Sequence, residues 1–465
     1  MRKLLVLGLA ALLVVAFTVP VSALENKFGG YWRTRFYGQY DFAGEDNAAA
    51  GLDSDDQYLQ QIDTRTRLYY TAVLNENLSL VNKFEFDAVW GAPGGRFGDY
   101  GDYGADAVAI EVKQTYALFN WGPTRFAVGT HDSLIARGFI FADEMSGLTV
   151  SYRTDTMNLV GEWIKGFEGG IGLDATGRDK ANDYDVDVFG LNPVFTLGEG
   201  FSLNPFIYYM YSDDSTFTAP GGATSTFGQN LFNAADLGFV AEELGLYWIG
   251  VNADFTLGPA SIWATGIYQG GSVDNNDTFN PAGQDLDVSA YLFAVGASMP
   301  LGPVGLHGQF FYASGDEKAD DDLEAFFGMG GGGVGWAYYW AEILGLGIFD
   351  NQTPPGTPGG DVSNIWAVNL GATLKPIEKL SITGDIWYAQ LVEDVVGATV
   401  GPTGSLSGGE SDLGTEIDLV ATYQLVEGLN LDLVGAYLFA GDAISVTGSN
   451  DDDPYEVGMR LSLSF

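Results

Sequence analysis

The sequence has no cysteine and almost no histidine. Its 465 residues include no Cys and only two His. Without cysteine, a disulfide framework, a thiolate metal site, a haem-attachment motif and a cysteine nucleophile are all excluded. His131 and His307 are not accompanied by a Ser or Asp arrangement at a recognisable spacing. The sequence therefore predicts no enzyme, no cofactor and no metal site.

Basic residues and long apolar runs are also scarce. The chain has 61 Asp and Glu against 20 Lys and Arg, a formal net charge of −41. Such acidity argues against nucleic acid or an anionic membrane surface as a partner. After residue 23, no stretch approaches the length of a membrane helix without Gly or charge. If this chain spans a membrane, it must do so as a closed β-barrel, the only other structure that satisfies its backbone in lipid.

The one long apolar run lies at the N-terminus. Two basic residues at positions 2 and 3 precede the run from Leu4 to Val19, and small residues at 21–23 follow it. This pattern is typical of a secretory signal cleaved after Ala23. An anchor helix is the alternative, but the run is short and ends at a proline. We therefore expect a signal peptide at 1–23 and a single transmembrane β-barrel domain at 24–465.

The last eleven residues, YEVGMRLSLSF, alternate strictly between apolar and polar side chains. They give a strand with one apolar face and one polar face, and they end on the aromatic residue Phe465. About 9 to 11 residues are enough for a tilted strand to cross a bilayer. The pattern predicts a membrane-spanning strand.

Most of the chain repeats one unit, in which an alternating strand, a tight turn, a second strand and a longer polar loop follow one another. The predicted tight turns lie at 75–77, 121–124, 155–157, 198–200, 258–260, 302–303, 376–379 and 427–428. The predicted long loops lie at 43–57, 91–106, 131–146, 167–182, 213–243, 271–284, 316–361, 393–412 and 442–453. The fold class predicted is all-β, a transmembrane antiparallel β-barrel of about 18 strands (16–18) with short periplasmic turns, long external loops and an aqueous interior.

Charged side chains at bilayer depth must face the lumen, where water solvates them. Applied to the early strands, this rule predicts a pore-lining set of Arg33, Arg35, Asp63, Arg65, Arg67, Lys83, Glu85, Asp87, Lys113 and Arg125. Applied to the late strands, it turns Glu416, Asp418, Asp432, Glu456 and Arg460 inward. Few basic residues occur after residue 180, so one wall of the lumen is expected to be cationic.

The paired arginines of the first two strands allow two interpretations. If the register is favourable, Arg33 and Arg35 lie near Arg65 and Arg67 and form a ladder of guanidinium groups. The ladder then forms a constriction with a transverse field that orients polar solutes. In the other interpretation, the arginines pair with acids on the neighbouring strands, namely Asp63, Glu85 and Asp87, and only rigidify the wall.

Three segments resemble porins of the Gram-negative outer membrane, in particular the large barrels of the alginate-export type. They are WRTRFYGQYDF at Trp32 to Phe42, IDTRTRLYYTAVL at Ile62 to Leu74, and the final strand. The resemblance implies that the terminal Phe465 is read by the assembly machinery and that the third external loop folds into the lumen. That loop is His131 to Gly147, and the constriction-loop candidates on it are Arg137, Asp143 and Glu144.

We therefore expect a passive diffusion channel in the cell outer membrane for small hydrophilic solutes or ions. Its surroundings would be outer-membrane lipid and lipopolysaccharide, and the sequence does not decide whether the chain forms a homo-oligomer. The alternative is a structural or conduit barrel that sheathes a partner protein or exports a polymer. The segment Phe326 to Phe349 is unusually apolar for an external loop. It could plug the lumen, pack over the barrel or form an oligomer interface, and the sequence leaves this choice open.

Overall fold

The computed structural model describes residues 24–42, 58–91, 110–167, 185–212, 241–275, 285–316, 322–329, 338–394, 410–444 and 452–465. The expected signal peptide lies outside these residues. The strands are β1 Glu25–Tyr40, β2 Tyr58–Asn75, β3 Leu78–Val89, β4 Glu111–Trp121, β5 Thr124–Ile135, β6 Phe141–Arg153, β7 Met157–Phe167, β8 Val186–Leu191, β9 Val194–Gly198, β10 Phe201–Ser212, β11 Ala241–Leu257, β12 Ala260–Asn275, β13 Leu286–Leu301, β14 Val304–Ala313, β15 Asp322–Leu323, β16 Ile365–Ile377, β17 Leu380–Leu391, β18 Asp412–Val426, β19 Leu429–Ala440 and β20 Tyr455–Ser464. A single turn of 3₁₀ helix, η3, covers Ala136–Gly138.

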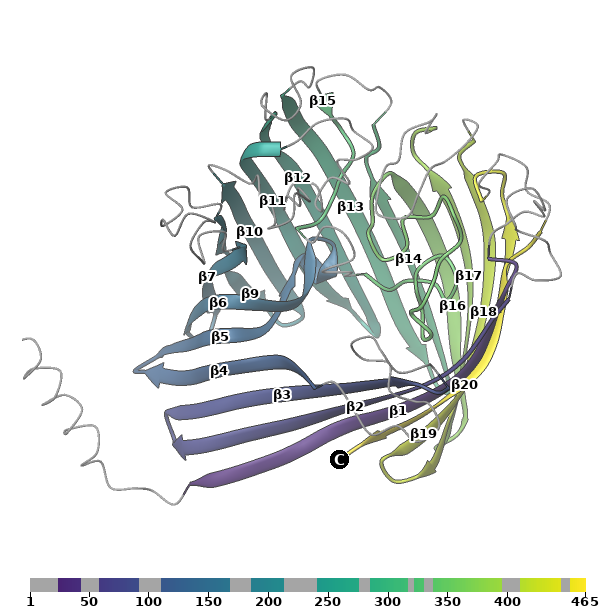
Figure 1. Cartoon of the computed structure of the whole chain (residues 1–465), viewed down its shortest axis with the longest axis horizontal. Helices are drawn as coiled ribbons and strands as arrows, with labels where there is room; N and C mark the ends of the chain where they lie inside the picture. Colours follow the sequence, from purple (N-terminus) through teal and green to yellow (C-terminus); the bar gives the residue numbers. More distant parts are fainter. Residues whose placement is uncertain are drawn as a thin grey trace, which may run out of the picture.

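These strands form one closed antiparallel barrel (Figure 1). The strands follow chain order around the ring, and β1 closes it by pairing with both β2 and β20. The short strands β8 and β9 share one position, because both pair with β7 on one side and β10 on the other. The two-residue β15 lies parallel beside the upper part of β13 and is not a wall strand of its own. The described strands therefore fill 18 positions, which confirms the predicted fold class.

All eight predicted tight turns connect neighbouring strands of the barrel. At the turn between β2 and β3, the Asn75 side chain accepts a hydrogen bond of 2.9 Å from the backbone N–H of Asn77. Such local bonds favour Asn at turns. At the turn between β4 and β5, Gly122 takes φ +59°, a conformation that glycine adopts without a steric penalty.

The two ends of the barrel wall meet at Gly30 and Phe465. The N–H of Gly30 donates to the carbonyl of Phe465 at 2.9 Å, and the N–H of Phe465 donates back at 3.2 Å. A Cβ on Gly30 would lie 2.5 Å from the Phe465 ring and 2.6 Å from the Arg67 carbonyl. The absence of a side chain at Gly30 therefore lets the last residue of the sequence complete the ring.

The strands are two-faced, as the alternating pattern requires. On β18, Ile417 and Leu419 are 44% and 55% exposed, whereas Glu416 and Asp418 are 0% and 5% exposed. The large apolar side chains thus form the outer surface of the barrel, and the acidic ones face its interior. Among the described residues, no helix has both the length and the apolar character needed to cross a membrane.

The loop predicted at 131–146 is wrong. Strands β5 and β6 continue through it in register, so that only residues 136–140 separate them. The residues of this predicted loop lie on a hairpin that bends into the barrel, where buried His131 alternates with exposed Asp132. We call residues 135–141 the hairpin tip. Figure 1 shows the end of this hairpin crossing toward β12 and β13.

The loop predicted at 316–361 is also wrong as an external loop. Residues 338–364, which we call the inner segment, pack against interior side chains of β1 and β18. Of the three places left open for the apolar segment, the lumen is correct for its described part. The loop predicted at 271–284 is shorter than expected, since β12 runs to Asn275. The remaining predicted loops, at 43–57, 91–106, 167–182, 213–243, 393–412 and 442–453, lie wholly or mainly outside the described residues.

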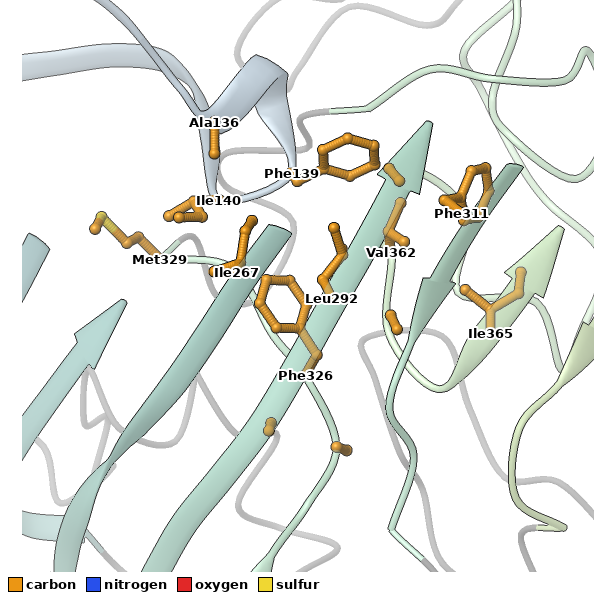
Figure 2. Packing of buried hydrophobic residues seen from close by; sticks show 14 of the residues in the cluster. Ala136, Phe139, Ile140, Ile267, Leu292, Phe311, Phe326, Met329, Val362 and Ile365 are labelled. Carbon is orange, nitrogen blue, oxygen red and sulfur yellow. The ribbon is translucent and has the colours of Figure 1, made fainter. Parts of the chain in front are cut away.

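An apolar core fills part of the barrel interior and holds the two inserted parts (Figure 2). Phe139 of the hairpin tip stacks on Tyr338 with ring centroids 4.1 Å apart. The N–H of Met329 donates to the carbonyl of Ile140 at 2.9 Å. Beneath them, the wall strands contribute Ile267, Leu292, Phe311 and Ile365. Burial of these side chains fixes the inserted parts. The same wall strands line a cavity nearer to their tight turns.

Candidate solute pathway inside the barrel

The lumen contains a cavity of about 1500 Å³ between the wall strands, residues 132–134 and 142–144 of the β5–β6 hairpin, and the inner segment. Its lining is rich in charge of both signs. The basic lining residues are Arg33, Arg65, Arg67, Lys113 and Arg460, and the acidic ones are Asp132, Asp143, Glu144, Asp254, Glu342, Asp350, Asp385 and Asp418. A cavity of this size and polarity can hold water, ions or a small polar molecule.

The basic wall comes from β20, β1, β2 and β4. Arg33 and Arg65 are direct cross-strand partners in the register of β1 and β2. Arg65 donates to Asp87 on β3 at 2.8 and 2.5 Å, and Arg67 is bonded to Glu85 on the same strand. Both guanidinium groups still border the cavity, with side chains 25% and 28% exposed. Each of these two arginines pairs with an acid on β3 and also borders the cavity. The geometry therefore combines the two interpretations of the ladder, pairing within the wall and contact with the lumen.

Arg35 is placed differently from the other arginines. It lies outside the cavity lining, and its side chain is only 7% exposed. Its guanidinium donates to Asp63 at 2.9 and 2.8 Å. It also donates to the backbone carbonyls of Ile348 and Phe349 in the inner segment, at 3.0 and 2.6 Å, and it is bonded to Asp350. Arg35 and Asp63 therefore connect the wall to the inner segment rather than to the cavity.

Of the remaining predicted residues, Lys113, Asp143 and Glu144 line the main cavity, Arg125 lines a second one, and Lys83, Glu85 and Asp87 line neither. Lys83 and Lys113 approach Glu144 at 3.5 and 2.8 Å, and this triad lies at the edge of the main cavity beside Asp143. Arg125 instead lines a smaller cavity of about 330 Å³ together with His131 and Glu162.

The constriction-loop candidate Arg137 reaches across the lumen to the opposite wall. It donates to Asp254 at 2.9 Å and to Thr265 at 3.1 Å, and it lies over the Trp263 ring at 5.2 Å. Arg137 and its neighbour Ala136 have φ of +62° and +52°, which is unfavourable for residues with a side chain. Arg137 thus secures the hairpin tip to β11 and β12.

Acidic lining residues also lie on β11, β17 and β18, and they include Asp254 and Asp385, which the sequence interpretation did not select. Asp385 accepts hydrogen bonds of 2.8 Å from Asn369 and from the His307 ring. A single charged residue within an alternating strand indicates a side chain that faces the lumen. This rule predicted the inward position of Asp418 and would also have predicted that of Asp385.

The inner segment adds three residues that sequence reasoning missed, Tyr339, Glu342 and Asp350. Tyr339 is 53% exposed in the cavity. The Glu342 carboxylate accepts the N–H of Ile348 at 2.7 Å, and burial raises its pKa to about 7. Burial likewise raises the pKa of Asp361 to about 7. Only the apolar composition of the segment signalled that it does not belong outside.

No family model matches the chain, and no curated protein is significantly similar to it in sequence. Solved structures of Pseudomonas aeruginosa outer-membrane proteins are similar in fold. OccK8 (OprE) superposes with a TM-score of 0.52 at 12% identity, covering 95% of this chain and 98% of its own. OprD gives 0.53 at 11% identity, with 96% and 95% covered, and OpdK with vanillate gives 0.53 at 9%, with 95% and 98% covered.

The chain has the fold of outer-membrane porins. This likeness covers nearly the whole chain, including the strands that carry the basic and acidic walls. It supports the general resemblance to Gram-negative porins. The narrower resemblance to the alginate-export type gains no support from it, because the paired arginines on the opening strands were too short a motif to identify a type of porin.

Proposed function

We propose that this protein is a passive diffusion channel of the outer membrane for small hydrophilic solutes or ions. One observation carries the proposal, namely the charge-lined cavity of about 1500 Å³ inside a closed barrel with an apolar exterior. The apolar exterior is stable only when a lipid bilayer covers it, and the charge-lined interior is stable only when it contains water. The fold shared with OprD and OpdK supports the same membrane.

The cavity carries charge of both signs across its width. Arg33, Arg65 and Arg67 lie on β1 and β2, and Asp254 lies on β11, about half of the ring away. Opposite charges on facing walls create a transverse field, which is only weakly screened within the roughly 10 Å Debye length of 0.1 M salt. A dipolar solute in this field orients as it passes, and the apolar core limits how large that solute can be.

Among the predicted pore-lining residues, we assign the solute path to Arg33, Arg65, Arg67 and Lys113, with Asp143 and Glu144 at its edge. A conduit that sheathes a partner protein is less well supported. The hairpin tip and the inner segment occupy the space that such a partner would need.

Liposome swelling tests the proposal. Liposomes containing the purified, folded protein should swell in isotonic solutions of small sugars or amino acids, and the rate should fall steeply as the solute grows. Equal rates with and without the protein for every solute would contradict a diffusion channel.

A further inference from the structure

The inner segment is bound to one wall of the barrel by Glu416 of β18. The two carboxylate oxygens accept the N–H groups of Ile343 and Leu344 at 2.6 and 2.9 Å. The whole Glu416 residue is 0% exposed. Each oxygen of this buried carboxyl group therefore has its own backbone donor. Two backbone donors that enter the lumen without a sheet partner are satisfied in this way.

A few residues further on, the segment is bound to β1 by Arg35. The Arg35 guanidinium meets the carbonyls of Ile348 and Phe349 and the carboxylate of Asp350 while it also holds Asp63. The Phe349 ring stacks on Tyr37, the next inward residue of β1, with centroids 4.6 Å apart and planes 9° apart. The segment thus runs inside the barrel along the wall formed by β18, β19, β20 and β1.

The backbone of the inner segment is strained. Leu346, Asp350 and Asn364 have φ of +63°, +34° and +45°. In the described part of the chain, only six residues other than glycine have a positive φ, and two of the other three lie in the hairpin tip. Such conformations persist only where the surroundings hold them. The path of the inner segment therefore depends on its anchors.

We infer that Arg35 and Glu416 are positioning residues that hold the inner segment inside the lumen against this part of the wall and so set the width of the channel. They do not touch the passing solute. This inference rests on the proposed function. Arg65 provides a matched comparison, because it is the same residue type on the adjacent strand. Its bonds go to β3 rather than to the inner segment, and it borders the cavity.

Single-channel recording in planar bilayers, with neutral polymers of graded size as molecular rulers, tests the inference. Arg35→Gln and Glu416→Gln should raise the unitary conductance severalfold and admit larger polymers. Arg35→Lys keeps the charge but not the planar fork, so it should have an intermediate cut-off. Arg65→Gln removes a charge that borders the cavity without releasing the inner segment, so it should change ion selectivity and shift the polymer cut-off far less than Arg35→Gln does. Heat-modifiable migration on gels verifies that each variant is folded.

A cross-linking experiment separates loss of the anchor from damage to the wall. The chain has no cysteine, so Tyr37→Cys and Phe349→Cys can be added to Arg35→Gln and joined by a short, reducible thiol cross-linker. Joining should return the polymer cut-off to the wild-type value, and reduction should raise it again. A wild-type cut-off in Arg35→Gln, or no effect of joining, would overturn the inference. Absence of conductance in every protein, wild type included, would instead overturn the channel itself.

Discussion

Glu342 should make docking of the inner segment sensitive to pH. Its carboxyl faces acidic groups on β17 and β18. Burial is the largest cause that raises its pKa from 4.5 to about 7, and Glu416 and Asp385 act in the same direction. The Ile348 N–H and Arg460 lower the pKa. The N–H of Glu342 itself donates to Asp418 at 3.4 Å. The ionised form of Glu342 is therefore disfavoured while the segment is docked.

The sign and size of the effect follow from linkage. Below about pH 4.5 the carboxyl is protonated whether the segment is docked or released, so docking is strongest there. As the pH rises toward about 7, only the released form ionises freely, and docking weakens by at most about 3 kcal/mol at 1.36 kcal/mol per pK unit. Glu342 borders the water-filled cavity, which reduces this upper value.

Single-channel recordings of the wild type and Glu342→Gln over about pH 4.5 to 7.5 provide the assay. The wild type should spend more time in a wider, higher-conductance state as the pH rises. The glutamine variant cannot ionise and can still accept the Ile348 N–H, so it should remain in the narrow state throughout. An identical pH profile in the two proteins, or widening of the wild type on acidification, would refute the reasoning.

Other predictions address selectivity, assembly, the lipid face and topology. The wild type should be weakly cation-selective in dilute KCl and less so at high salt. Replacement of both Arg65 and Arg67 by Gln should shift the reversal potential further toward cation selectivity. An unchanged reversal potential would mean that these two arginines do not border the conducting path. Deletion of Phe465 should lower the amount of heat-modifiable protein in outer membranes, because its two bonds to the first strand close the barrel, while surviving channels keep their conductance. Leu461→Arg should lower the free energy of unfolding by about 2 to 4 kcal/mol near the bilayer midplane, as measured by urea titration in lipid vesicles, whereas a neutral effect would mean that this face does not meet lipid. A protease added to intact cells should cut within 213–240 and spare the tight turns; cleavage only after the outer membrane is opened would invert the topology.

The sequence was sufficient to predict the strands and turns of the barrel wall, because local residue patterns determine them. Turns such as 75–77 and 258–260 carry Asn or Gly where the backbone needs them, and side-chain alternation decides which residues face inward. The same parity correctly turned Glu416 and Asp418 to the interior.

The interior of the barrel could not be predicted in the same way. A segment inside a wide lumen meets water on one side and protein on the other, so neither a period of two nor a polar composition marks it. Arg35 is bonded to Asp350, which lies more than 300 positions away in the chain. No local pattern links the two residues, and the sequence therefore placed Arg35 on the solute path with Arg65 and Arg67.

Single-channel recording of the purified wild-type protein in a planar bilayer tests the central claim most directly. The account predicts discrete, reproducible conductance steps with weak cation selectivity in dilute KCl, from a pore that excludes all but small neutral polymers. Folded, membrane-inserted protein that produces no conductance steps at any salt concentration or pH would contradict it.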